Sequence, residues 1–195
     1  MSGRGRNEAV VIACSTGGLR ALGIVLAGLD PALPVPVIVL CHRGQDDDGA
    51  LLLELLARLS PLPVQEAEER HPALPGIVHL APSGYHLLVE ADATFMLSTE
   101  ARVRFVRPSA DVLFASASAA WGASLLAVVL TGANDDGADG LQVVRRRGGY
   151  ALVQDPDEAE ARQMPAAALE RAGADAVLPL SAIARRINER CCRHD

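Results

Sequence analysis

The chain has 195 residues, half of them hydrophobic, which is enough to bury one sizeable core in a single domain. The formal net charge of −6 argues against a nucleic-acid-binding protein, because phosphate binding requires a basic surface. No apolar stretch approaches the roughly 20 residues that cross a bilayer, and the start, MSGRGRNE, lacks the apolar segment of a secretory signal. We therefore expect a cytoplasmic protein without membrane insertion, built as one domain over residues 1–195 with its core at about 9–190.

Short apolar runs recur along the chain, each followed by a turn signal and a longer helical pattern, which is typical of strand-helix units on a parallel sheet. The runs that predict buried strands are Ala9 to Cys14, Val35 to Cys41, Leu125 to Thr131, Tyr150 to Gln154 and Ala176 to Leu178, with Val64-Gln65 as a candidate sixth. The predicted helices are Gly18 to Leu29, Gly49 to Leu59, Ala110 to Trp121, Gly137 to Arg147, Glu158 to Ala172 and Ser181 to Cys191. The predicted fold class is α/β, a doubly wound, mostly parallel sheet with helices on both faces.

The stretch from Gly76 to Val106 breaks this alternation. It contains four short apolar runs separated by turn-forming residues: Ile77 to Leu80, His86 to Val89, Thr94 to Leu97 and Arg102 to Phe105. Short strands joined by tight turns are typical of hairpins. We expect a region of antiparallel hairpins inserted in the α/β layers.

Three reactive side chains follow predicted strands: Ser15 after the first, His42 after the second, and Asp136 in the loop after the third. In a doubly wound sheet, ligands bind outside the carboxyl ends of the strands. If the first two strands are neighbours, His42 can reach Ser15 as a general base, and Asp136 can hold the imidazole in the right tautomer. This pattern predicts a serine triad, although Asp135 and Asp139 compete with Asp136 on composition alone.

The stretch "ACSTGG" places Ser15 at a strand-to-helix turn. Gly17 and Gly18 allow a tight bend and leave the hydroxyl exposed, and the N-H groups at the helix start could stabilise an oxyanion. Ser15 or Thr16 could equally cap the helix, and the histidine and the aspartate have similarly ordinary structural interpretations.

Other site chemistries are less well supported. A metal site at Asp46-Asp47-Asp48 or Asp135-Asp136 has no His or Cys partner at ligand spacing. A phosphate site at Gly17-Gly18 lacks both Gly-x-Gly-x-x-Gly and Gly-Lys-Ser/Thr. A thiol enzyme using Cys14 is a further alternative, but strand alternation points Cys14 away from the face that Ser15 uses. The residues therefore disfavour both a metal site and a nucleotide site.

Four stretches in order, "ACSTGG", "CHRG", "RPSADVLF" and "LTGANDDGADG", resemble the catalytic domain of the chemotaxis protein-glutamate methylesterases, the CheB type. The similarity runs from roughly Ala9 to Leu180 and includes "LAPSGYH" and "QDPDEAEARQMPAAAL". It implies a doubly wound α/β fold and a triad of Ser15, His42 and Asp136. The family's aspartate directly precedes the glycine of its "TG...DG" motif, here Gly137, which selects Asp136 among its neighbours.

The resemblance implies that Ser15 attacks the methyl ester of a glutamate on a chemoreceptor, the expected protein partner, and that methanol leaves. The family also deamidates certain receptor glutamines, and the resemblance implies that neither a cofactor nor a metal is needed. By the same resemblance, Thr16 helps to orient His42. The residues expected near the oxyanion are Thr16, Gly17 and Ala133. The residues expected to contact acidic receptor helices are Arg20, Arg43 and Arg107.

The chain departs from the family pattern at three positions near the expected site. Cys14 stands in a motif that is often "GASTGG", Cys41 replaces a usual Gln, and Ala133 replaces the Met of "TGMG". Family members usually carry a phosphorylated receiver domain, whereas the first strand here begins by about Ala9, so we expect a domain that is constitutively open or regulated by a separate protein. The alternative is a non-enzymatic signalling scaffold with the esterase fold.

Overall fold

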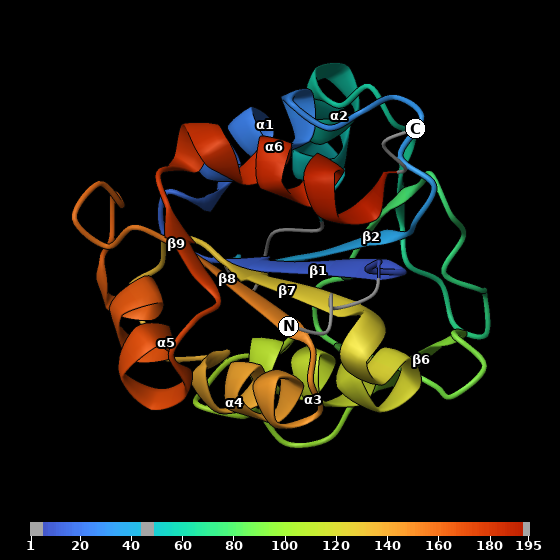
Figure 1. Cartoon of the computed structure of the whole chain (residues 1–195). Coiled ribbons are helices and arrows are strands. Elements are labelled where there is room, and N and C mark those ends of the chain that lie inside the picture. Colours follow the sequence, from blue (N-terminus) through green and yellow to red (C-terminus); the bar gives the residue numbers. More distant parts are fainter. Residues whose placement is uncertain (1–5, 44–48, 193–195) are drawn as a thin grey trace.

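The computed structural model describes residues 6–43 and 49–192. Its centre is a seven-stranded sheet with the order β3-β4-β2-β1-β7-β8-β9, in which every strand pair is parallel (Figure 1). The strands are β1 (Ala9–Cys14), β2 (Val37–Cys41), β3 (Val64–Glu66), β4 (Val78–Leu80), β7 (Leu125–Val129), β8 (Tyr150–Gln154) and β9 (Ala176–Leu178). This topology confirms the predicted α/β class.

Helices cover both faces of the sheet (Figure 1). One face carries α1 (Gly18–Ala27), α2 (Ala50–Leu59) and α6 (Leu180–Cys191). The other carries α3 (Ala110–Trp121), α4 (Ala138–Arg146) and α5 (Gln163–Ala172), with the 3-10 turn η1 (Gly122–Ser124) after α3. Within the described ranges 6–43 and 49–192, no helix is long and apolar enough to span a bilayer.

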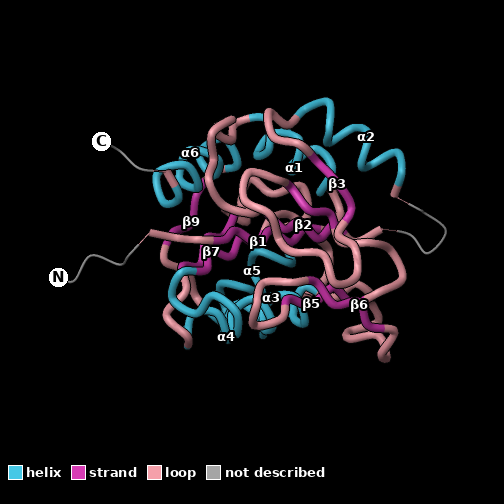
Figure 2. The backbone as a smooth tube through the Cα atoms, turned by 90° about the vertical axis from the view of Figure 1, so that its right-hand side faces the viewer, coloured by secondary structure: helices cyan, strands magenta, loops and turns pink. Residues whose placement is uncertain are grey.

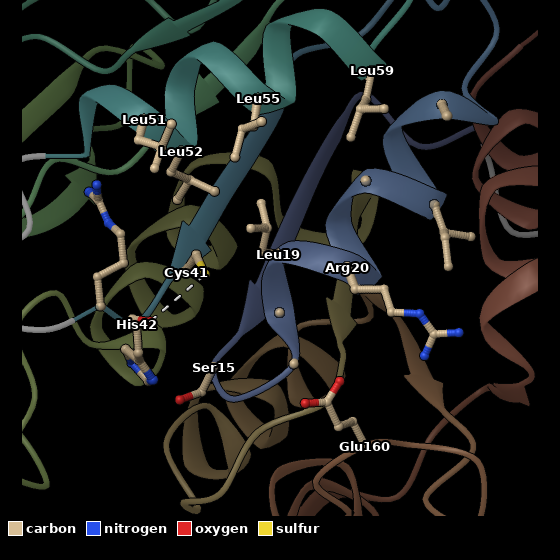
Figure 3. Close-up of a pocket in the computed structure, with 16 residues that line it drawn as sticks. Ser15, Leu19, Arg20, Cys41, His42, Leu51, Leu52, Leu55, Leu59 and Glu160 are labelled. Carbon is tan, nitrogen blue, oxygen red and sulfur yellow. Dashed lines mark hydrogen bonds between the residues drawn. The ribbon is translucent and has the colours of Figure 1, made fainter.

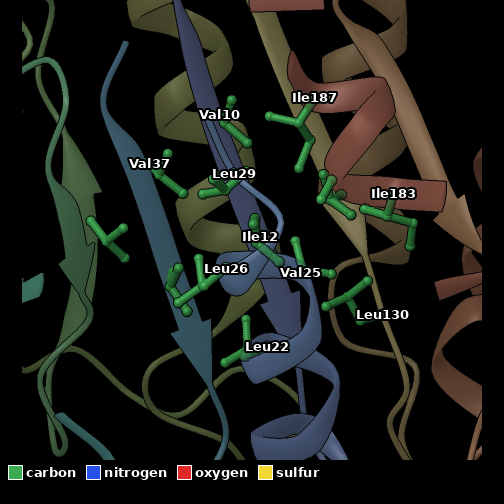
Figure 4. Close-up of a cluster of buried hydrophobic side chains, with 14 of the residues drawn as sticks. Val10, Ile12, Leu22, Val25, Leu26, Leu29, Val37, Leu130, Ile183 and Ile187 are labelled. Carbon is green, nitrogen blue, oxygen red and sulfur yellow. The ribbon is translucent and has the colours of Figure 1, made fainter. Parts of the chain in front are cut away.

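Strand β1 lies at the centre of the sheet, and all six of its side chains are fully buried. Val10 and Ile12 belong to the cluster under α1 and α6, part of which Figure 4 shows. Val11 and Ala13 belong to the cluster under α3, α4 and α5. A strand buried on both faces needs apolar residues at every position, which explains the continuous run Ala9–Cys14.

The region from Gly76 to Val106 contains one antiparallel hairpin, β5 (His86–Val89) paired with β6 (Phe95–Ser98), on the same side of the sheet as α3 (Figure 2). The expectation that Ile77 to Leu80 belongs to a hairpin is wrong. This run forms β4, which is buried on both faces and lies parallel between β2 and β3.

The expected strand at Arg102 to Phe105 is also wrong. Val103 and Val106 exchange backbone hydrogen bonds of 3.2 and 2.9 Å across a tight turn. The two central residues, Arg104 and Phe105, have φ angles of 49° and 67°. Such left-handed angles reverse the chain and do not occur in an extended strand.

The last departure concerns the helix expected from Glu158, which begins at Gln163. The preceding segment bonds to the neighbouring strand end instead of to itself. Gly132 donates its N-H to the carbonyl of Ala161 at 3.0 Å and accepts the N-H of Met164 at 2.8 Å. This pairing fixes the loop that follows β7.

Candidate active site

Strands β1 and β2 bring Ser15 and His42 to the same edge of the sheet. Cys14 pairs with Cys41 in the parallel register, so Ser15 and His42 are the next residues on two neighbouring strands. The N-H of His42 donates to the carbonyl of Cys14 at 3.0 Å. Both side chains line one pocket and lie at the same end of it (Figure 3).

Ser15 lies at a sharp turn between β1 and α1, where the N-H of Gly18 donates to the Ser15 carbonyl at 2.7 Å. Gly17 has a φ of 76°, which favours glycine, and a Cβ there would lie 2.8 Å from Oε2 of Glu160. A Cβ at Gly132 would come within 3.0 Å of the Ser15 Cβ. Close approach therefore explains both glycines, and the Ser15 hydroxyl itself bonds to none of the described residues.

The imidazole of His42 contacts a carboxylate from a distant part of the chain. Its Nε2 lies 2.9 Å from Oδ2 of Asp136, and the exposed fractions of the two side chains are 8% and 0%. Because an ionised carboxylate only accepts hydrogen bonds, Nε2 carries the proton of the neutral ring. Nδ1 is then the basic nitrogen.

Asp136 is held by the start of α3. It accepts hydrogen bonds from the Ser109 hydroxyl at 2.7 Å and from the backbone N-H groups of Ala110 and Asp111 at 2.6 and 3.2 Å. Burial acts to raise the pKa of Asp136, but the hydrogen bonds from His42, Ser109 and Ala110 outweigh it and hold the pKa below its usual value. The carboxylate is therefore ionised at neutral pH.

The two competing aspartates bind elsewhere. Asp135 and Asp139 both form ion pairs with Arg104, whose Nε also lies 3.1 Å from Asp111. Of the three candidates, only Asp136 contacts His42 in the part of the chain that the structure describes. Sequence reasoning missed Arg104, since nothing local to it signals a distant carboxylate cluster.

Asn134 is the second residue on the imidazole, and the sequence analysis did not single it out. Its Nδ2 lies 3.2 Å from Nδ1 of His42, and its Oδ1 accepts the N-H of Asp136 at 3.2 Å. The signal was present, because an asparagine two residues before Asp136 is typical of an Asx turn.

Of the residues expected near the oxyanion, Gly17 lines the pocket with Ser15, whereas Thr16 and Ala133 are not among its lining residues. No described residue accepts a hydrogen bond from the backbone N-H of Thr16, Gly17 or Ala133. The Thr16 side chain is exposed, and its hydroxyl makes no hydrogen bond to His42 within residues 6–43 and 49–192. The described partners of the imidazole are instead Asp136 and Asn134.

The structure separates the three candidate arginines. Arg20 and Arg43 line the pocket with Ser15 and His42. Arg107 is not among its lining residues and donates to the backbone carbonyls of Thr99 and Glu100 at 2.6 and 2.9 Å.

The pocket has a volume of about 1080 Å³ and extends from Ser15 and His42 along α1 and α2 (Figure 3). Its far part is apolar, lined by Leu19, Ile24, Leu51, Leu52, Leu55 and Leu59. Sequence reasoning predicted both helices but not the groove between them.

The alternative chemistries find little support. Asp46-Asp47-Asp48 lie outside the described residues, and the described ones contain no cluster of three or more His, Cys, Asp or Glu side chains that could hold a metal. The Cys14 thiol is fully buried in the cluster under α1. A hydrogen bond with Cys41 and then burial raise the pKa of Cys14 well above its usual value, which disfavours a thiolate nucleophile.

Residues 10–187 match the family model described as CheB methylesterase. The chain belongs to the CheB methylesterase family. It is 44% identical over 177 residues to a putative protein-glutamate methylesterase/protein-glutamine glutaminase of Leptospira interrogans, with 91% of each chain covered. A protein-glutamate methylesterase/protein-glutamine glutaminase of Carboxydothermus hydrogenoformans is 37% identical over 192 residues, which cover 95% of this chain and 56% of that one.

Members of the family also include a solved structure with the same fold. The crystal structure of the Thermotoga maritima CheB methylesterase catalytic domain superposes with a TM-score of 0.90 at 32% identity. The match covers 94% of this chain and 98% of that one, so the similarity extends over the whole catalytic domain.

Proposed function

We propose that this chain, as a member of the methylesterase family, hydrolyses glutamate methyl esters on chemoreceptors with Ser15 as nucleophile, His42 as base and Asp136 as its orienting carboxylate. The observation that carries the proposal is the contact of 2.9 Å between His42 Nε2 and Asp136 Oδ2, at the sheet edge where Ser15 also lies. The names of the relatives supply the substrate, a protein glutamate methyl ester or glutamine.

The reaction follows from the protonation state of the imidazole. Ser15 Oγ attacks the ester carbonyl carbon while its proton moves to His42 Nδ1, and the N-H groups of Thr16, Gly17 and Ala133 stabilise the oxyanion. The tetrahedral intermediate collapses, the C-O bond to the methoxy group breaks, and the proton on Nδ1 leaves with methanol.

Water completes the cycle. It adds to the acyl-Ser15 carbonyl, gives one proton to Nδ1, and the proton returns to Ser15 Oγ as free glutamate forms. Asp136, ionised at neutral pH, stabilises the imidazolium in both halves. Deamidation of a glutamine follows the same steps with ammonia as the leaving group.

The test is methanol release from a methylated chemoreceptor. Ser15→Ala is expected to lower kcat by about 10³-fold or more, because the covalent step is lost. Ser181→Ala, an exposed serine on α6 outside the pocket, is the matched control and should retain the parent rate. A parent protein that binds the receptor without releasing methanol would instead favour a scaffold.

A further inference from the structure

The amide of Asn134 contacts both partners of the proposed base. Its Nδ2 lies 3.2 Å from His42 Nδ1, and its Oδ1 accepts the N-H of Asp136 at 3.2 Å. The second contact decides which end of the amide faces the ring. Because a backbone N-H requires an acceptor, the carbonyl oxygen of Asn134 faces Asp136 and the NH₂ group faces His42.

The nitrogen that Asn134 contacts is the one needed for catalysis. Asp136 accepts the Nε2 proton of His42, so the only lone pair of the neutral ring is on Nδ1. An amide NH₂ can only donate, so it occupies that lone pair. The Ser15 hydroxyl, which must donate to the same atom, makes no hydrogen bond within residues 6–43 and 49–192.

The loop around Asn134 is fixed on both sides. Before it, Gly132 is bonded to Ala161 and Met164. After it, Asp135 is paired with Arg104, and the N-H of Gly137 donates to Asp111 at 3.0 Å. These contacts place Asn134 beside the ring without help from a ligand.

Between these fixed points, the backbone N-H and C=O groups of Ala133 and Asn134 bond to none of the described residues. The amide can therefore turn away from His42 by breaking only its two side-chain hydrogen bonds.

We propose that Asn134 is a positioning residue that holds the resting His42 with its basic nitrogen occupied, and that Ser15 becomes nucleophilic when the amide releases Nδ1. The inference rests on the triad proposed above. While the amide donates to Nδ1, that nitrogen has no lone pair free to accept the Ser15 proton. Asn134 thus slows proton transfer from Ser15.

Two variants test the rate. Asn134→Ala removes the amide, whereas Asn134→Ser keeps a short acceptor for the Asp136 N-H and cannot reach the imidazole. Both are expected to raise kcat for methanol release about fivefold, the factor that one ordinary hydrogen bond represents, with little change in KM. An unchanged or lower kcat in Asn134→Ser, at an unaltered melting temperature, would overturn the inference.

The rate at which a fluorophosphonate labels Ser15 separates this inference from the proposed substrate, because labelling needs proton transfer but no glutamate ester. Faster labelling of both variants supports the role of Asn134 even where the parent releases no methanol. Equal or slower labelling contradicts it.

A spectroscopic measurement tests the contact without turnover. In a Ser15→Ala background with ¹⁵N-labelled histidine, adding Asn134→Ser should move the His42 Nδ1 resonance to higher frequency, as expected when an imidazole nitrogen loses its donor. Nε2 should stay protonated through Asp136. An unmoved Nδ1 resonance would show that the amide does not bond to the ring in solution and would overturn the inference. Where no labelling rate is measurable, the Nδ1 resonance alone decides between support and rejection.

Discussion

The imidazole of His42 reaches Asp136 through Nε2, the ring nitrogen farther from its own Cβ, at 2.9 Å. With Nε2 on the carboxylate, Nδ1 is the ring nitrogen nearer to the His42 backbone. The backbone N-H of His42 in turn donates a hydrogen bond to the carbonyl of Cys14, the residue before Ser15. The carboxylate therefore determines which nitrogen is available to the serine. A serine and a histidine at the ends of paired strands need only short side-chain reach to meet.

Asp136→Asn tests the role of the carboxylate. An amide can present its NH₂ to Nε2 and so favour the opposite tautomer, and kcat is expected to fall by about 10³- to 10⁴-fold. Asp135→Asn is the matched control, since Asp135 pairs with Arg104 and not with His42. Equal losses of methanol release in the two variants would contradict the assignment of Asp136.

The lowered pKa of Asp136 also predicts how stability depends on pH. Burial opposes the shift, but the hydrogen bonds from His42, Ser109 and Ala110 keep the folded pKa below that of the unfolded chain, about 3.9. The stabilisation is thus complete above about pH 4 and is lost as pH falls through the folded pKa. We expect the difference in unfolding free energy between the parent and Asp136→Asn to shrink below about pH 4, measured by urea denaturation. A difference that stays constant down to pH 3 would rule out this contribution.

Gly17→Ala is expected to destabilise the turn under Ser15. Its φ of 76° costs a side chain about 1 kcal/mol, and the new Cβ would also lie 2.8 to 2.9 Å from Glu160 atoms. Gly84→Ala provides the matched control, because Gly84 has a φ of 81° but a Cβ added there would meet nothing within 4 Å. Urea denaturation should show a larger loss of unfolding free energy for Gly17→Ala than for Gly84→Ala. Equal losses would mean that the Glu160 side chain moves aside at no cost in free energy.

Cys14→Ala distinguishes a buried thiol from a nucleophile. The Cys14 side chain is fully buried and its pKa is raised, so the variant should keep the parent kcat while losing about 1 kcal/mol or more of stability to the cavity. In the native protein, iodoacetamide at pH 8 should leave Cys14 unmodified, and unfolding in urea should expose it, as mass spectrometry can show. Loss of methanol release in Cys14→Ala with retention in Ser15→Ala would reverse the roles.

Much of the fold was predictable because its buried strands are continuous apolar runs. The run at β1 has no polar alternation, and only a strand covered on both faces tolerates that. β4 was misassigned because a short run carries too few residues to show which kind of strand it forms. A run as short as Val78–Leu80 fits a hairpin or a parallel interior strand equally well, and only the strands that pair with it on either side distinguish the two.

The site was predictable to the extent that chemistry follows strand ends. The adjacency of Ser15 and His42 depends on which strands pair, and the family motifs supplied Asp136 among three similar aspartates. Asn134 and Arg104 act through contacts across the fold. Asn134 contacts His42, which is 92 residues away in the sequence, and Arg104 contacts Asp135, which is 31 residues away. The Asx turn at Asn134 has a local signature, but no local pattern encodes its contact with His42 or the contact of Arg104 with Asp135.

The order of the central strands has a consequence for synthesis. Ser15 directly follows β1, His42 directly follows β2 on one side of it, and β7 on the other side leads into the loop that contains Asp136. A growing polypeptide that ends before β7 contains Ser15 and His42 but not Asp136. On the proposed mechanism, hydrolysis requires β7 to dock against β1, and a product truncated before β7 is expected to release no methanol.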